Sequence, residues 1–176
     1  IARDTESSLR TAISLAEGVD LVITIGVATV VDHDLVGEVA QSLGLDRSFY
    51  KVAMRPGKPL MAGRMAESAM FGLPGNPVSA MVCGHVFILP MLRHMLGLGA
   101  GAPDLKQAEL ARDIDQNGPR EHYMRALVHG GKLNAFDNQD SANLRLLSSA
   151  KALLVRAPNA GPQTAGTTVE YLPLWG

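Results

Sequence analysis

Cysteine is almost absent from this sequence, and so is an excess of either charge. Cys83 is the single cysteine among 176 residues, which excludes a disulfide within the chain and is typical of a reducing compartment. Because it lies in an apolar run, we expect Cys83 to be a small buried side chain rather than a reactive thiol. The 16 Lys and Arg residues against 17 Asp and Glu residues argue against a nucleic-acid-binding protein.

Aromatic residues and long apolar stretches are also scarce. Aromatic side chains form 5% of the chain, too few for a platform on which nucleic-acid bases could stack. No run of ~18 uninterrupted apolar residues occurs, so we expect no membrane span. The charged N-terminus lacks the apolar segment of a signal peptide, so we expect a cytoplasmic protein. The chain begins at Ile1, directly before a helix signal, and we expect it to be part of a longer protein.

Helices and strands alternate along the first half of the chain, a pattern typical of an α/β layer structure. Residues 20–25 form a β-rich run without alternation, which predicts a strand buried on both faces of a parallel sheet. A long helix should open at Asn76 and Pro77 and be kinked at Pro90. The other predicted elements are a helix capped by Asp4 or Thr5 and ended by Gly18, a helix over 35–43 ended by Gly44, a strand over 48–54, and a hairpin of 60–62 with 69–73.

The composition changes abruptly over residues 97–103, where glycine and alanine predominate as in a linker. Beyond it, residues 123–129 and 132–136 flank two glycines, a strong hairpin signal. Further strands are predicted over 152–156 and 168–172, with a helical turn over 143–149. We therefore predict two domains, an α/β part over residues 1–98 and a small barrel or sandwich over residues 104–176.

Two carboxylates follow the predicted strand over 20–25. In open α/β sheets ligands collect at the carboxyl ends of strands, so the loop after this strand is a favourable place for a site. Asp32 and Asp34 could hold a divalent cation through oxygen ligands, or one of them could cap the next helix. The five histidines show no zinc-type spacing.

Two further segments favour anions. Arg55 and Lys58 flank a Pro-Gly turn that could aim both cations at one anion, although a solvated basic turn is the alternative. The segment 72–79 is a strand end, a tight turn and a helix N-terminus whose unpaired N–H groups favour an anion. Ser79 adds a hydroxyl there, and the alternative is a well-made helix start. These patterns indicate an α/β domain with an oxyanion-binding edge, joined to a small β domain.

Two runs of residues carry a resemblance to a known family. They are Val52-Ala53-Met54-Arg55-Pro56-Gly57-Lys58-Pro59 and Gly72-Leu73-Pro74-Gly75-Asn76-Pro77-Val78-Ser79-Ala80. Together they resemble the paired signature of the molybdopterin molybdenumtransferases, the MoeA/gephyrin E-domain family. Residues 22–36 are similar to the glycine-rich loop of that family, and the similarity continues through 121–125 and 139–141.

The resemblance implies both a fold and an activity. The fold is the C-terminal part of a molybdopterin-binding three-layer α/β domain over residues 1–98, followed by a small all-β barrel domain over residues 104–176. The activity belongs to molybdenum cofactor biosynthesis: molybdate is inserted into adenylylated molybdopterin and AMP is released, with the help of Mg²⁺ or another divalent cation. The resemblance also implies a homodimer in the full-length protein, whose isolated fragment would be inactive.

Carried over residue by residue, the resemblance implies roles for particular side chains. Asp32 and Asp34 would lie near the metal and the phosphoanhydride, and Lys58 would act with them in catalysis. The implied substrate-binding residues are Thr29, Arg55, Lys58, Pro59, Gly75, Asn76, Ser79, Arg125 and Ser141.

The loop departs from the family pattern at two positions. Val27 and Val31 stand where the family usually has glycine. We expect these valines to strain the loop or narrow the pocket, unless both adopt ordinary negative φ and pack into the core. Two alternative functions are a non-catalytic binding or scaffold module with the same fold and a related molybdopterin adenylyltransferase. The predicted β domain argues against the adenylyltransferase.

Overall fold

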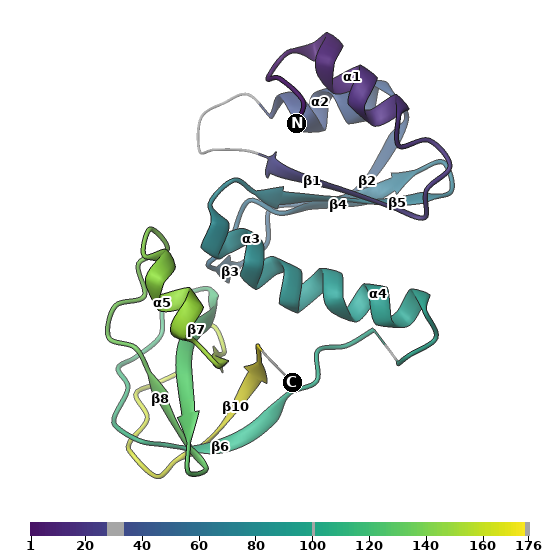
Figure 1. Ribbon diagram of the computed structural model, residues 1–176. Helices are drawn as coiled ribbons and strands as arrows, with labels where there is room; N and C mark the ends of the chain where they lie inside the picture. Colours follow the sequence, from purple (N-terminus) through teal and green to yellow (C-terminus); the bar gives the residue numbers. More distant parts are fainter. Residues whose placement is uncertain (28–33, 100, 175–176) are drawn as a thin grey trace. The chain divides into compact units, whose positions relative to one another are not determined.

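The computed structural model describes residues 1–27, 34–99 and 101–174 (Figure 1). The chain divides into two compact units. The α/β unit comprises Ile1–Val52 and Gly57–Ala80. The barrel unit comprises Ala53–Pro56 and Met81–Gly176.

The α/β unit is built on a four-stranded sheet in the order β1-β5-β4-β2. Only β1 and β5 run parallel, whereas β5 with β4 and β4 with β2 are antiparallel, so the sheet is mixed. The hairpin predicted from 60–62 and 69–73 is confirmed as β4 and β5. The elements of this unit are α1 (Glu6–Ser14), β1 (Leu21–Val27), α2 (Leu35–Ser42), β2 (Leu45–Tyr50), β4 (Met61–Met65), β5 (Ser68–Pro74) and the start of α3 (Pro77–Cys83).

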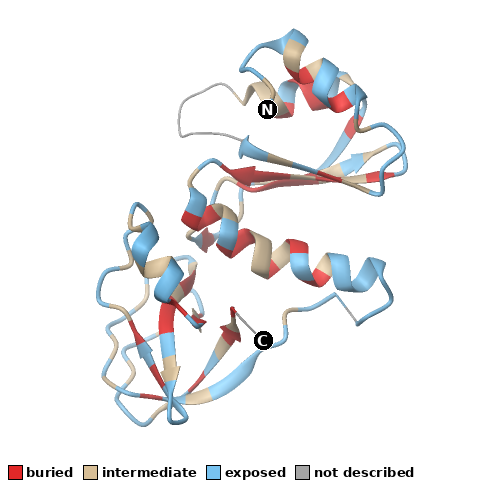
Figure 2. Ribbon diagram, viewed as in Figure 1, coloured by how far each residue is buried: buried red, intermediate tan, exposed pale blue. Residues whose placement is uncertain are grey.

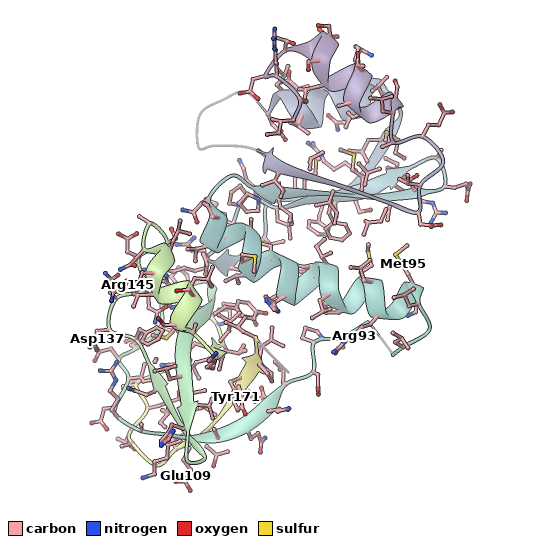
Figure 3. The ribbon with its side chains drawn as sticks, in the orientation of Figure 1. Arg93, Met95, Glu109, Asp137, Arg145 and Tyr171 are labelled. Carbon is pink, nitrogen blue, oxygen red and sulfur yellow. The ribbon has the colours of Figure 1, made fainter. Side chains whose placement is uncertain are left out.

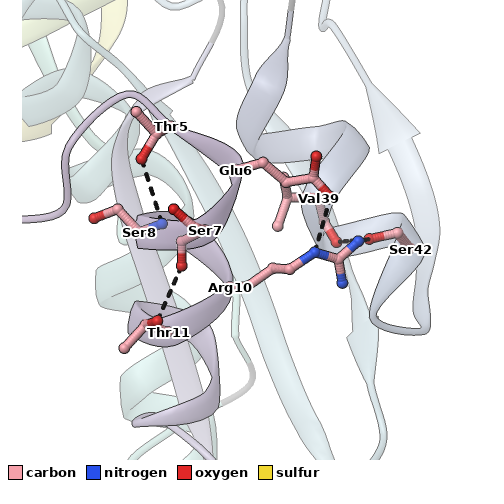
Figure 4. A network of polar contacts seen from close by, with 8 residues as sticks. All are labelled: Thr5, Glu6, Ser7, Ser8, Arg10, Thr11, Val39 and Ser42. Atoms are coloured by element: carbon pink, nitrogen blue, oxygen red, sulfur yellow. Dashed lines mark hydrogen bonds and ion pairs between the residues drawn. The ribbon is translucent and has the colours of Figure 1, made fainter.

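Helices α1 and α2 cover one face of this sheet (Figure 1). Leu9 and Ile13, four residues apart on α1, are both buried. Each such side chain contributes about 1.5–3 kcal/mol when it leaves water. A polar contact also joins the two helices: Arg10 donates to the Glu6 carboxylate at 2.9 Å and to the Ser42 hydroxyl at 2.8 Å (Figure 4).

Two predicted element boundaries in this unit are wrong. Helix α1 ends at Ser14 instead of reaching Gly18. Its N-cap is Thr5, one of the two predicted caps, whose hydroxyl accepts from the Ser8 amide. The predicted strand over 48–54 is two strands, β2 and β3 (Met54–Arg55). Lys51 separates them with a φ of 68°, a left-handed conformation that no strand continues through.

The prediction that the first strand is buried on both faces is also wrong. Strand β1 lies at the edge of the four-stranded sheet, and Ile23 and Ile25 are 42% and 70% exposed (Figure 2). An apolar run without alternation cannot show which face of its strand is covered, because coverage depends on elements elsewhere in the chain.

A continuous helical segment from Pro77 to Met95 connects the two units in sequence. It consists of α3, a π-helical stretch over Gly84–Ile88 and α4 (Leu89–Met95). The kink predicted at Pro90 stays a prediction, but this π segment ends shortly before it: the Leu89 amide donates to the Gly84 carbonyl, five residues back. Since proline has no N–H and its ring crowds the preceding turn, a wider turn accommodates it.

The same helical segment has 19 residues and is apolar enough to cross a membrane by length and composition alone. Of its most apolar window, 44% is buried inside the structure. Core helices of soluble proteins share these properties, so the segment does not by itself identify a membrane protein.

The barrel unit contains a closed sheet. Its strands follow the order β3-β7-β8-β6-β10-β9, and β7 also pairs with β9, so five strands form a barrel with β3 added beside β7. The predicted hairpin around Gly130 and Gly131 is confirmed as β7 and β8, whereas β6 was not predicted. The elements are β6 (Lys106–Leu110), β7 (Glu121–His129), β8 (Lys132–Ala135), α5 (Leu144–Ser149), β9 (Ala152–Arg156) and β10 (Thr168–Pro173).

The described residues of the segment 97–103 form neither helix nor strand. The division by spatial contacts falls earlier, between Ala80 and Met81, so most of the long helical segment is grouped with the barrel. The mixed α/β part followed by a β-barrel is the predicted fold class.

Candidate functional site

Three chain segments meet at one edge of the four-stranded sheet. Strand β1 ends beside the end of β5, since Ile25 pairs with Leu73, and β4 begins at the same edge, since Met61 pairs with Gly72. A Cβ built on Gly75, just after β5, would lie 3.4 Å from the Cα of Gly26. The turn that enters β4 therefore lies beside the carboxyl ends of the parallel strands β1 and β5. Open α/β sheets bind ligands at this end of their strands.

Lys58 is carried by the turn that enters β4. The Lys58 carbonyl accepts hydrogen bonds from the Val52 and Leu60 amides, both at 3.0 Å, and Leu60 is fully buried. The Lys58 side chain is exposed, and Pro59 beside it is half-buried. The backbone of this turn is therefore fixed while its cation remains accessible at the sheet edge.

Asn76 caps the helix that follows β5. Its Oδ1 accepts from the Ser79 amide at 3.0 Å and from the Ser79 hydroxyl at 3.3 Å. Ser79 is buried, with 7% of its surface exposed. The well-made helix start is thus present, and an anion would share these donors with the Asn76 side chain. The binding roles of Gly75, Asn76 and Ser79 stay predictions.

Asp34 caps α2, which is one of the two roles that the sequence predicts for the acidic pair. Its Oδ1 accepts from the Gly37 amide at 3.0 Å, and its Oδ2 is buried without a hydrogen-bond partner. Asp34 also helps to raise the pKa of Tyr50, after the larger effect of burial. Asp32 and Thr29 lie outside the described residues, and the described part of the chain contains no cluster of three or more metal-ligating side chains.

The remaining predicted residues belong to the barrel unit. Arg55 is exposed in β3, where it pairs with His122 of β7. Arg125 is 2% exposed, and its guanidinium donates to the carbonyls of Asp140 at 2.9 Å and Asn143 at 3.0 Å. Burial lowers the pKa of Arg125, an effect that Asp140 opposes. Arg125 therefore holds the loop that carries Ser141, so the structure brings these two predicted residues into one region of the barrel.

The effect expected of Val27 stays a prediction. Val27 continues β1 and pairs with Pro74. Beside it, Gly26 has a φ of 111° at an irregularity in the β1–β5 register. Val31 lies outside the described residues. Glycine is thus retained at the position where the backbone requires it.

Cys83 is fully buried, as predicted. Burial raises the pKa of its thiol to about 12, so the thiolate needed for nucleophilic chemistry does not form near neutral pH. By contrast, the sequence patterns did not single out His122 and Arg156, which are also buried. A barrel interior is recognisable only after its strands have been paired.

Comparison with known proteins assigns both parts of the chain. Residues 1–94 match a family model described as a probable molybdopterin binding domain, and residues 107–174 match the MoeA C-terminal region (domain IV). This chain belongs to the MoeA family. The match over the barrel also argues against the adenylyltransferase alternative, for which no such β domain is expected.

Similar relatives cover most of this MoeA-family chain. The molybdopterin molybdenumtransferase of Bacillus subtilis is 30% identical over an alignment of 176 residues, which covers 98% of this chain and 41% of the relative. Molybdopterin molybdenumtransferase 2 of Mycobacterium tuberculosis (strain H37Rv) is 33% identical over an alignment of 162 residues, which covers 88% of this chain and 40% of the relative. This chain therefore spans about two fifths of the length of these relatives.

A solved structure supports the same fold. The molybdopterin biosynthesis MoeA protein from Pyrococcus horikosii superposes with a TM-score of 0.81 at 25% identity. The similarity covers 99% of this chain and 42% of the archaeal chain.

Proposed function

We propose that this chain takes part in inserting molybdate into adenylylated molybdopterin, with release of AMP, as a portion of a molybdopterin molybdenumtransferase. Membership of the MoeA family supports a role in molybdenum cofactor biosynthesis. The observation that carries the finer proposal is the meeting of three segments at one sheet edge: the ends of β1 and β5, the Lys58 turn and the helix start at Asn76.

The donors at this edge suit a doubly charged oxyanion. Lys58 supplies an exposed ammonium group, and the nearby helix start supplies the positive end of a backbone dipole. Lys58 would thus hold and orient molybdate while the pterin occupies the end of β1. The resemblance also implies substrate-binding roles for Arg125 and Ser141 of the barrel unit.

Asp34 is our candidate ligand, among the described residues, for the implied divalent cation. One of its carboxylate oxygens caps α2, and the other has no hydrogen-bond partner. One carboxylate together with substrate phosphates and water is a donor set that Mg²⁺ accepts, so the residues present fit this ion. When bound, Mg²⁺ would offset the negative charge of the phosphoanhydride.

Turnover by the full-length protein tests the proposal. Lys58→Ala should raise the molybdate concentration needed for half-maximal turnover by roughly ten- to a hundredfold, because a charge-assisted hydrogen bond contributes about 1.5–3 kcal/mol. Lys132→Ala, which removes an exposed lysine in the barrel, should leave it unchanged. If Lys58→Ala has wild-type molybdate dependence, the assigned role of Lys58 is wrong. A wild-type protein that binds the pterin without turnover would favour the scaffold alternative.

The cytoplasmic location and the homodimer of the full-length protein also stay proposals. The same holds for the strain or obstruction expected from Val27 and Val31, which binding of adenylylated molybdopterin before and after Val27→Gly with Val31→Gly would test.

A further inference from the structure

The barrel unit contains a cavity of its own at one end of its interior. Ala126 of β7 and Leu154 of β9 belong to the barrel core. Since side chains alternate along a strand, His122 and Arg156 face the same interior. Both line a cavity of about 290 Å³, together with Arg55 and residues of the loop that follows β6.

Arg156 is an unusual residue for the interior of a small barrel. It is 2% exposed, and its Nη2 donates to the carbonyls of Ala160 and Gly161, at 3.4 and 2.6 Å. Its Nε is buried and has no hydrogen-bond partner. The ion pairs in the described part of the chain are formed by Arg10, Arg64 and Arg112. No carboxylate among the described residues forms an ion pair with Arg156. A buried cation with an unused donor is costly unless an anion completes its surroundings.

His122 lies in the same positively charged environment. It is 7% exposed, and its pKa is lowered to about 4, chiefly by burial and then by Arg55, Arg120, Arg156 and Arg125 in that order. His122 is therefore neutral at pH 7 and can donate one N–H without needing a charge.

Two of the three acidic residues of the cavity lining have partners of their own. Asp137, labelled in Figure 3, forms an ion pair at 2.6 Å with Arg112, which also lines the cavity. Asp113 accepts a hydrogen bond from the Ala165 amide at 2.8 Å. Asp115 is the third acidic residue of the lining, against the cations Arg55 and Arg156. The interior end of the cavity, where Arg156 lies buried, thus favours an anion.

We propose that this cavity binds a phosphate group, with Arg156 and His122 donating to its oxygens and Arg55 at the opening. Guanidinium N–H groups form strong charge-assisted hydrogen bonds with phosphate oxygens. The group can come from inorganic phosphate or from a small phosphorylated molecule, and a volume of about 290 Å³ leaves room for the latter. The site does not rest on the proposed molybdate chemistry, although Arg55 is assigned to both.

The imidazole of His122 reports on this site directly. The full chain, with ¹⁵N-labelled histidine, is titrated with inorganic phosphate and separately with glycerol 3-phosphate, without molybdate or pterin. A bound anion should shift the His122 nitrogens and raise the pKa of His122 above its starting value of about 4. Tighter binding of glycerol 3-phosphate would identify an organic phosphate site, and equal affinities would identify a site for the phosphate group alone. If neither compound moves the His122 signals, the proposal is overturned.

Two arginine variants separate direct binding from general attraction. Arg156→Gln should weaken binding of the better probe at least tenfold. Arg120→Gln should change it less than about twofold, because Arg120 affects His122 electrostatically but does not line the cavity. If both variants lose the same binding affinity, the positive charge of the barrel attracts the probe without a specific site, and the proposal is overturned. If Arg156→Gln does not fold, the wild-type titration still decides, and its failure leaves the proposed molybdate role untouched.

Discussion

At the scale of the single residue, the side chain of Asn76 has two candidate roles, a helix cap and a contact to substrate. Asn76→Ala removes the acceptor of the Ser79 amide and should lower the free energy of unfolding by about 1 kcal/mol, measured by urea denaturation. Asn134→Ala, at an exposed position of β8, is the control. Asn76→Asp keeps a cap acceptor but adds negative charge, so it should preserve stability and weaken molybdate binding. Unchanged molybdate affinity in Asn76→Asp would show that Asn76 acts as a helix cap and does not contact the substrate.

His122 should make stability depend on pH. Its pKa is about 4 in the folded state, against an ordinary value near 6.5, so the unfolded chain binds more protons between these values. The stability that depends on a neutral His122 is fully present above about pH 6.5 and is lost as the pH falls towards 4. The largest loss of free energy of unfolding is about 3 kcal/mol. Urea midpoints measured from pH 7 to pH 4 should fall less steeply in His122→Gln. Equal slopes in the two proteins would contradict the low pKa.

At the scale of the element, two glycines in regular structure should respond oppositely to alanine. Gly84 opens the π segment, and a Cβ there would meet no atom within 4 Å. Gly63 lies in β4, where a Cβ would be 2.5 Å from the Asp46 carbonyl oxygen of β2. Gly84→Ala should therefore stabilise the protein by about 0.5–1 kcal/mol through helix propensity, since nothing obstructs it.

Gly63→Ala should instead destabilise the protein by about 1–3 kcal/mol, because two strand backbones must move apart. Urea denaturation at constant m-value measures both changes. A stabilising Gly63→Ala would show that the close approach of β2 and β4 is not required by the fold.

At the scale of the whole molecule, we propose a domain boundary within residues 97–103. The core of the barrel consists entirely of residues after this segment: Leu110, Ala126, Leu133, Ala135, Ala152, Leu154 and Val169. The β7–β9 pairing closes the barrel without β3. A chain of residues 104–176 should therefore unfold cooperatively and give a dispersed NMR spectrum. If only a longer chain beginning at Met81 folds, the boundary lies where the spatial contacts divide the chain.

The elements that depend on local chemistry were determined by the sequence itself. The hairpin at Gly130 and Gly131 needs left-handed backbone at both glycines, with φ values of 57° and 76°, which two adjacent glycines supply. The helix start at Asn76 and Pro77 follows in the same way from a side-chain acceptor and a fixed φ. The motifs that resemble the MoeA family consist of residues adjacent in the chain, so they can be recognised without knowledge of the fold.

Properties that depend on pairing between distant segments were decided only by the tertiary structure. The exposure of Ile23 and Ile25 follows from the place of β1 at the sheet edge, which an apolar run cannot reveal. The juxtaposition of Gly26 with Gly75 required β1 to pair with β5, a strand far along the chain. His122 and Arg156 share one cavity because β7 pairs with β9. Closure of a barrel brings together side chains whose spacing along the chain carries no signal.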